Sequence, residues 1–161
     1  MKKNKTMSNY LHELSKKSTY SSIEMQYPKI REVLFPRFIE WDGCVLLSQN
    51  EQLDLPNKFI PTPYCPDKTG FEAGENHIHF SDYLEKVHKN PLEGLRIALE
   101  IMDIWTCRLK KKFPETKFLI ILSFDGEDAI LRFHTMREDE PFWIDITNLD
   151  GFSEGIAILE I

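Results

Sequence analysis

The stretch ENHIHF, residues 75–80, is the candidate for metal chemistry in this sequence. Side chains two positions apart in a strand point to the same side, so His77 and His79 could bind one metal ion together. A tetrahedral site needs two further donors, for which the sequence offers only Glu75, Cys65, His88 and His134. We therefore expect no metal, and keep as the alternative a metal-dependent hydrolase or small-molecule-binding enzyme centred on His77 and His79.

Motifs for other kinds of catalysis are absent or weak. The sequence contains no GxxxxGK[ST] loop, no GxGxxG after a strand and no GxSxG elbow. Cys65 has Lys68 nearby but no neighbouring histidine, which is a poor setting for a nucleophilic thiol. The run 138–140 gives its three carboxylates one wet environment, whereas an acid–base pair needs two different ones. We therefore expect a protein without a cofactor that is not an enzyme.

Acidic and aromatic residues are interleaved in REDEPFWIDITNLDGFSEG, residues 137–155. Residues 1–20 carry five lysines against one glutamate, which gives +4, whereas residues 123–161 carry two arginines against ten acids, which gives −8. Nucleic acid is therefore not the expected partner, because phosphates need cations opposite them. Clustered carboxylates speed association with a cationic protein, and an exposed tryptophan can anchor it. The predicted partner-binding residues are Glu138, Asp139, Glu140, Trp143, Asp145, Asp150 and Glu154.

Composition predicts one soluble domain over residues 1–161, with residues 1–6 as a flexible tail. The chain is 42% hydrophobic and 29% charged, with a net charge of −6. Three cysteines without a CxxC motif fit free thiols in a reducing compartment. The most apolar segment, 91–109, contains five charged residues, so we expect no membrane span and a cytoplasmic protein. We expect a monomer or a weak homodimer, because the last strand, GIAILEI, could form an exposed edge.

The clearest element is a helix that begins at Pro91, after Asn90 as N-cap, and ends before Pro114. Its apolar stripe predicts that it packs against a sheet. A hairpin follows, with Asp125-Gly126 as a two-residue turn. In that register Phe124 faces Glu127 and Leu122 faces Ala129. The side predicted to face the helix carries Phe118, Ile120, Leu122, Ala129, Leu131 and Phe133.

Weaker patterns complete the predicted fold. Strands are expected at 44–48, 141–147 and 155–161, and helices at 9–17, capped by Ser8, and from Ser21 or Ser22 onward. The proline-rich 56–66 segment reads as a long loop pinned by its aromatic residues. The predicted fold class is α+β, with a mainly antiparallel C-terminal sheet of about four strands packed on a long central helix and with N-terminal helices.

With these features the chain resembles the immunity proteins of bacterial toxin–immunity pairs, including those of contact-dependent growth inhibition systems. The resemblance lies in a small acidic α+β domain without catalytic motifs, and in the interleaved acids and aromatics of residues 137–155. It implies a cytosolic, non-enzymatic inhibitor that binds a toxin domain. The toxin would often be a nuclease, and the inhibitor would block its active site or an essential surface.

Overall fold

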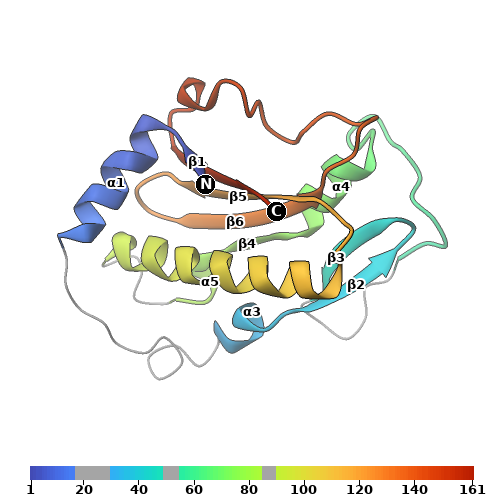
Figure 1. Ribbon diagram of the computed structural model, residues 1–161, viewed down its shortest axis with the longest axis horizontal. Helices are drawn as coiled ribbons and strands as arrows, with labels where there is room; N and C mark the ends of the chain where they lie inside the picture. The colour runs from blue at the N-terminus through green and yellow to red at the C-terminus, as the bar shows by residue number, and fades with distance from the viewer. Residues whose placement is uncertain (17–29, 49–54, 85–89) are drawn as a thin grey trace.

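The computed structural model describes residues 1–16, 30–48, 55–84 and 90–161. They form an α+β fold with a five-stranded sheet in the order β1-β7-β5-β6-β4 and a separate two-stranded sheet, β2-β3 (Figure 1). All strand pairs are antiparallel, as the sequence predicts. Among the residues described, no helix has the length and apolar composition that a membrane span requires.

The centre of the sheet is the predicted hairpin, β5 (Phe118–Phe124) with β6 (Ala129–Thr135). Its connection is a four-residue loop, because Asp125 Oδ1 accepts hydrogen bonds from the backbone N–H groups of Glu127 and Asp128, both at 2.8 Å. Phe124 therefore faces Ala129, and the predicted register is wrong by two residues. A shift of two leaves every side chain on its face of the sheet, so the predicted division of the hairpin into two faces remains correct.

The helix α5 (Pro91–Lys112) lies along one face of the sheet, as predicted. Its buried side chains join those of the hairpin in the main core, where Trp105 packs at 5.8 Å, centroid to centroid, from Phe133. The Trp105 indole N–H donates to the backbone carbonyl of Val33 at 2.8 Å, which ties the short helix α3 (Arg31–Leu34) to α5. The helix predicted from Ser21 or Ser22 falls mostly outside the described residues.

The opposite face of the sheet is covered by the segment 136–152, which crosses it without pairing (Figure 1). The strand predicted at 141–147 is therefore wrong. Ile144 and Ile146 pack instead on a small second core formed by four side chains of β5 and β7: Leu119, Ile121, Ile156 and Ile158. The segment cannot pair with β5, because β6 and β7 already occupy both edges of that strand.

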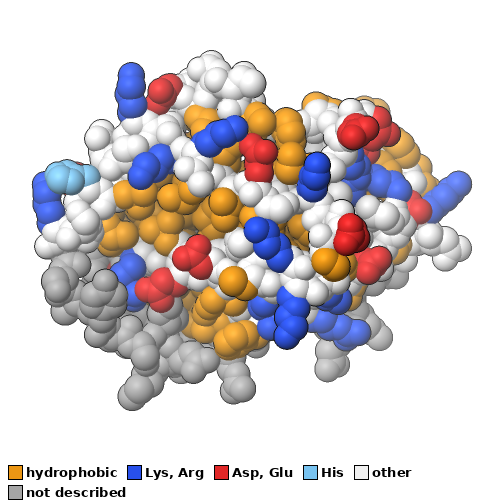
Figure 2. Space-filling view, viewed as in Figure 1, with side chains coloured by type: hydrophobic (Ala, Val, Ile, Leu, Met, Phe, Trp, Pro, Cys, Tyr) orange, Lys and Arg blue, Asp and Glu red, His pale blue; other side chains and the backbone are white. Residues whose placement is uncertain are grey.

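The N-terminus is part of the sheet rather than a flexible tail. β1 (Lys2–Lys3) pairs with β7 (Gly155–Glu160), so the last strand, correctly predicted from the sequence, is not an open edge along its whole length. Asn4 is 2% exposed and caps α1 (Lys5–Ser15), which begins four residues earlier than predicted. The Asn4 side chain also accepts a hydrogen bond from the Ile156 backbone N–H and donates one to the Glu154 carbonyl. These bonds link the start of the helix to the sheet. Figure 2 shows apolar side chains gathered between α1 and α5.

The remaining elements form one end of the molecule. The predicted strand 44–48 is β3 (Cys44–Ser48), and it pairs with β2 (Arg37–Trp41) through the turn Asp42-Gly43, in which both residues have positive φ. The helix α4 (Lys68–Glu75) and the edge strand β4 (His77–His79) follow the proline-rich loop. α4 lies between this hairpin and β6.

Candidate protein-binding site

The seven predicted partner-binding residues lie on or just after the covering segment, and they differ in what they contact. Glu138 and Asp139 are exposed, and no hydrogen bond or ion pair within the described ranges engages their carboxylates. Trp143 is 45% exposed, and its ring lies over the Arg132 guanidinium at 5.5 Å from the ring centroid. These three side chains are therefore free to meet a partner from the solvent side.

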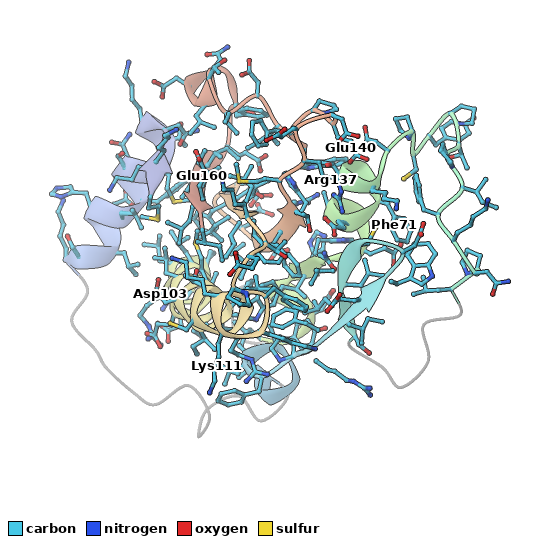
Figure 3. The ribbon with its side chains drawn as sticks, turned by 45° about the vertical axis from the view of Figure 1, so that its right-hand side comes forward. Phe71, Asp103, Lys111, Arg137, Glu140 and Glu160 are labelled. Atoms are coloured by element: carbon cyan, nitrogen blue, oxygen red, sulfur yellow. The ribbon has the colours of Figure 1, made fainter. Side chains whose placement is uncertain are left out.

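Glu140 has an internal structural role. Its carboxylate accepts from the backbone N–H groups of Lys68 at 3.2 Å and Thr69 at 2.7 Å, at the start of α4, and lies 3.7 Å from Arg137 (Figure 3). Partial burial alone would raise the pKa of this carboxyl, but these hydrogen bonds and the arginine hold the pKa below its ordinary value. Glu140 thus fixes the covering segment to α4.

Of the other three acids, Asp145 and Asp150 have partners inside the molecule, and Glu154 is partly buried. Asp145 accepts from the Thr147 hydroxyl and backbone N–H, which lowers the pKa of its carboxyl. Asp150 accepts from the backbone N–H of Lys5 at 2.9 Å, at the start of α1. Burial raises the pKa of the Glu154 carboxyl, since desolvation disfavours the charged form. Their role in binding a partner stays a prediction.

Trp143 forms part of a groove that the sequence does not reveal. The groove has a volume of about 470 Å³ and lies between the proline-rich loop, α4 and residues 141–143. We call it the aromatic groove. Three of its rings are exposed to solvent: Tyr64 at 99%, Trp143, and Phe142 at 38%. Asp67 and Glu75 are its charged residues, and no lysine, arginine or histidine of the described chain lines it.

The proline-rich loop is held against the β2–β3 hairpin by specific hydrogen bonds. The Trp41 indole N–H donates to the Pro56 carbonyl at 2.7 Å, and the Phe59 backbone N–H donates to Asp42 Oδ2 at 2.9 Å. Asp42 also forms an ion pair with Lys68 at 3.2 Å. The loop, which forms one wall of the groove, is therefore pinned to the body as predicted, by these hydrogen bonds and by the packing of Phe59 on Phe71, whereas Tyr64 is exposed and does not pin it.

The opposite wall, α4, is fastened by a buried polar network. Glu72 is fully buried, and its carboxylate accepts from the backbone N–H of Val45 in β3 at 2.6 Å and from the hydroxyl of Thr135 in β6 at 2.9 Å. Arg137 supplies the countercharge at 3.0 Å from Glu72 Oε2. One turn later, the Asn76 amide accepts from Leu47 N–H and donates to the Val45 carbonyl. Glu72 of α4 and Asn76, which follows the last residue of the helix, thus satisfy strand edges that would otherwise lack partners.

His77 and His79 lie on one side of β4, as predicted, with ring centroids 5.4 Å apart. Each Nδ1 is engaged: that of His77 with the Gly74 carbonyl, and that of His79 with Asp128 Oδ2 at 2.9 Å. Glu75 ends α4 rather than sharing the strand, and it lines the aromatic groove. Within the described residues no three His, Cys, Asp or Glu side chains form a group that could hold a metal ion. His88 lies outside those residues.

Sequence reasoning identified Trp143 but missed most of the groove. Tyr64, Phe71 and Glu75 lie far from it in the chain, and only the fold brings them together. Figure 3 shows Phe71 between the loop and the β2–β3 hairpin. The available signal was the loop itself, because a long ordered loop that keeps several aromatic residues is commonly functional.

Comparison with known proteins identifies one family. A model described as the uncharacterized protein PM0498 family matches residues 2–161, and the chain therefore belongs to that family. No curated protein and no solved structure matches the chain. Because the family's description names no activity, function has to be inferred from the geometry of the molecule.

Proposed function

We propose that this member of the PM0498 family is a non-enzymatic protein that binds a cationic protein partner through the aromatic groove. The supporting observation is the exposure of Tyr64, Phe142 and Trp143 around a groove whose charged residues are Asp67 and Glu75. Aromatic residues supply most of the energy at protein interfaces, and large exposed rings gathered at one place mark interaction sites. The acids select a partner of positive charge.

Glu138 and Asp139 extend this negative potential. Only Glu140 separates them from Pro141, Phe142 and Trp143 in the chain, and their carboxylates are unpaired in the described structure. Charges at the rim of an interface act on the association rate more than on the dissociation rate. The rings would therefore hold the partner, and the acids would attract it.

The partner we propose is a toxin domain, and the protein's role is that of an immunity protein that neutralises it. A nuclease domain fits the charge, because a surface that binds phosphates is cationic. The resemblance to immunity proteins in the interleaved acids and aromatics of residues 137–155 supports this choice.

Binding is tested by comparative capture from the host organism. Three tagged proteins are compared: the wild type, the groove variant Tyr64→Ala/Trp143→Ala, and Phe35→Ala, which removes an exposed ring outside the groove. We expect one basic protein at near-equal stoichiometry with the wild type and Phe35→Ala, and at least about tenfold less with the groove variant. Equal capture by all three proteins would contradict the proposal.

Inhibition is tested separately, on the captured partner. Its activity against nucleic acid, and the growth of cells that express it, are measured with increasing amounts of the wild type or of the groove variant. An immunity protein abolishes both activity and toxicity at one equivalent, and the groove variant requires an excess. A partner that binds at the groove but keeps its activity would leave the binding role standing and remove the inhibitory one.

A further inference from the structure

A second hollow, of about 410 Å³, lies beside the aromatic groove and shares Cys65, Phe71 and Glu75 with it. Three aromatic rings line it: Trp41 from β2, Phe59 from the proline-rich loop and Phe71 from α4. We call it the three-ring pocket. Because Phe71 and Glu75 line both hollows, a side chain of a partner seated in the groove can also reach the pocket.

The rings of the three-ring pocket are held in fixed positions. Phe71 packs between the other two, at 5.3 Å from Trp41 and 5.6 Å from Phe59, with interplanar angles near 50°. Hydrogen bonds fix Trp41 through its indole N–H and Phe59 through its backbone N–H. Such a set of inclined rings is already organised before a ligand enters, which reduces the entropic cost of binding.

The charges around the pocket favour a cation. Glu75 is an exposed carboxylate that lines it, and in the part of the chain that the structure describes it makes no hydrogen bond or ion pair. Lys68 is nearby but is paired with Asp42. Phe59 follows Lys58 in the chain, yet Lys58 does not line the pocket. Three aromatic faces and one unpaired carboxylate together favour a positive group.

We propose that the three-ring pocket receives an arginine side chain of the partner, an assignment that rests on the proposed binding function and specifies its chemistry. A guanidinium is planar, so it can stack on a ring face while its N–H groups reach a carboxylate. It is also more weakly hydrated than the ammonium group of lysine, so it loses less on entering an aromatic site. A purely apolar side chain would leave Glu75 without a partner.

Short peptides test this without the partner. The probe is acetyl-Gly-Arg-Gly-amide, compared with its citrulline counterpart, which has nearly the same shape but no charge, and with its lysine counterpart. The three tryptophan indole N–H signals report by NMR: Trp41 lines the pocket, Trp143 lines the neighbouring groove, and Trp105 is buried in the core. Each signal is assigned by its Trp→Phe variant.

We expect the arginine peptide to move the Trp41 signal in a saturable way and to leave the Trp105 signal in place. Glu75→Gln should weaken this binding by about fivefold, since it removes the charge and keeps the shape. Glu127→Gln, which makes the same change in the β5–β6 loop, should not alter it. An unmoved Trp41 signal, or equal effects of arginine, citrulline and lysine peptides, would overturn the assignment.

The two proposals can fail independently. If the arginine peptide does not bind but a basic partner is captured through the aromatic groove, the arginine assignment is wrong and the binding function remains. If the peptide binds as expected but no captured protein depends on the groove, the proposed function is wrong. In that case the pocket is a site for free arginine-like ligands, and its assignment to a side chain of a partner is overturned.

Discussion

Two buried polar side chains near the edge of β6 differ sharply in how they are satisfied. The Glu72 carboxylate accepts four hydrogen bonds, whereas His134, which is fully buried, has an Nε2 atom without a hydrogen-bond partner in the described structure. Its Nδ1 bonds to the Thr135 carbonyl at 2.9 Å, and its ring lies 6.2 Å from that of Phe142. His134 is therefore a close neighbour of one of the rings of the aromatic groove.

The burial of His134 predicts that the folded protein becomes less stable as the pH is lowered. Burial lowers the pKa of its imidazole below 6.5, an effect that Arg137 reinforces and that Glu72, Asp67 and the Thr135 carbonyl oppose. The unfolded chain then takes up the proton first. The stability that comes from keeping His134 neutral in the folded state is thus complete above pH 6.5. It is lost as the pH falls from 6.5 toward the lowered pKa of His134 in the folded protein.

We expect the free energy of unfolding to fall below pH 6.5 by up to about 1.4 kcal/mol per pH unit through this residue. His134→Phe, which cannot titrate, should lose that part of the pH dependence in urea unfolding between pH 7 and pH 5. His12→Gln, a change on the exposed side of α1, is the matched histidine control. If His134→Phe and the wild type respond to pH in parallel, His134 is not the source.

At the scale of elements, α4 replaces a strand at the end of the sheet. β4 pairs with β6 only as far as His77, which faces Arg132. Beyond that point, Asn76 donates to the Phe133 carbonyl and Glu72 accepts from the Thr135 backbone N–H. The same two side chains bond to β3. Trp41 belongs to the β2–β3 hairpin and Phe71 to α4, so the hydrogen bonds of Glu72 and Asn76 also set the geometry of the three-ring pocket.

Glu72→Gln should therefore destabilise the whole end of the molecule. All four groups around the carboxylate are hydrogen-bond donors, and an amide would present N–H groups to some of them. The largely buried Arg137 would keep only the more distant Glu140 carboxylate, at 3.7 Å, as its countercharge. We expect a loss of about 3–5 kcal/mol in urea unfolding at pH 7. Glu127→Gln should change stability by less than about 0.5 kcal/mol. A Glu72→Gln loss below about 1 kcal/mol would show that the network contributes little.

At the scale of the whole molecule, the uneven charge of the sequence is partly cancelled by folding. The basic N-terminus lies beside the acidic C-terminal strand, where Lys2 Nζ is 3.2 Å from Glu160 Oε1. Asp150 meets the start of α1 through Lys5 N–H. Three acids in or near the aromatic groove remain unpaired in the described structure: Glu75, which lines it, and Glu138 and Asp139, which are available at its rim to attract a partner.

Association with the captured partner should accordingly depend on salt and on these two acids. Glu138→Lys/Asp139→Lys should slow association by about tenfold at low salt and change dissociation little, as stopped-flow fluorescence can measure. Glu13→Lys/Glu127→Lys makes the same change in net charge, in α1 and in the β5–β6 loop, and should have a smaller effect. Figure 1 shows α1 and this loop at the end of the molecule opposite to α4. Association that is insensitive to salt from 50 to 300 mM would contradict electrostatic steering.

Elements that leave a local pattern in the chain could be predicted from the amino-acid sequence alone. The apolar stripe and the proline limits of α5 indicated a helix of nearly the observed length, and the alternation in 118–135 placed each hairpin side chain on its observed face. These predictions succeeded because periodicity follows directly from backbone geometry. The turn was misjudged because the Asp125 side chain, which no periodicity reports, closes a longer loop.

The segment that covers the second face of the sheet and the location of the candidate site could not be predicted, because both depend on long-range contacts. Residues 141–147 alternate like a strand, yet both edges of β5 are taken by β6 and β7, so Ile144 and Ile146 pack on the sheet, partly buried, without pairing. Competition for strand edges is a property of the assembled sheet and leaves no mark in a local pattern. The aromatic groove and the three-ring pocket likewise join position 41 to the segments 55–75 and 141–143. Tertiary contacts bring them together: Glu72 and Asn76 bind β3, and Glu140 binds the start of α4.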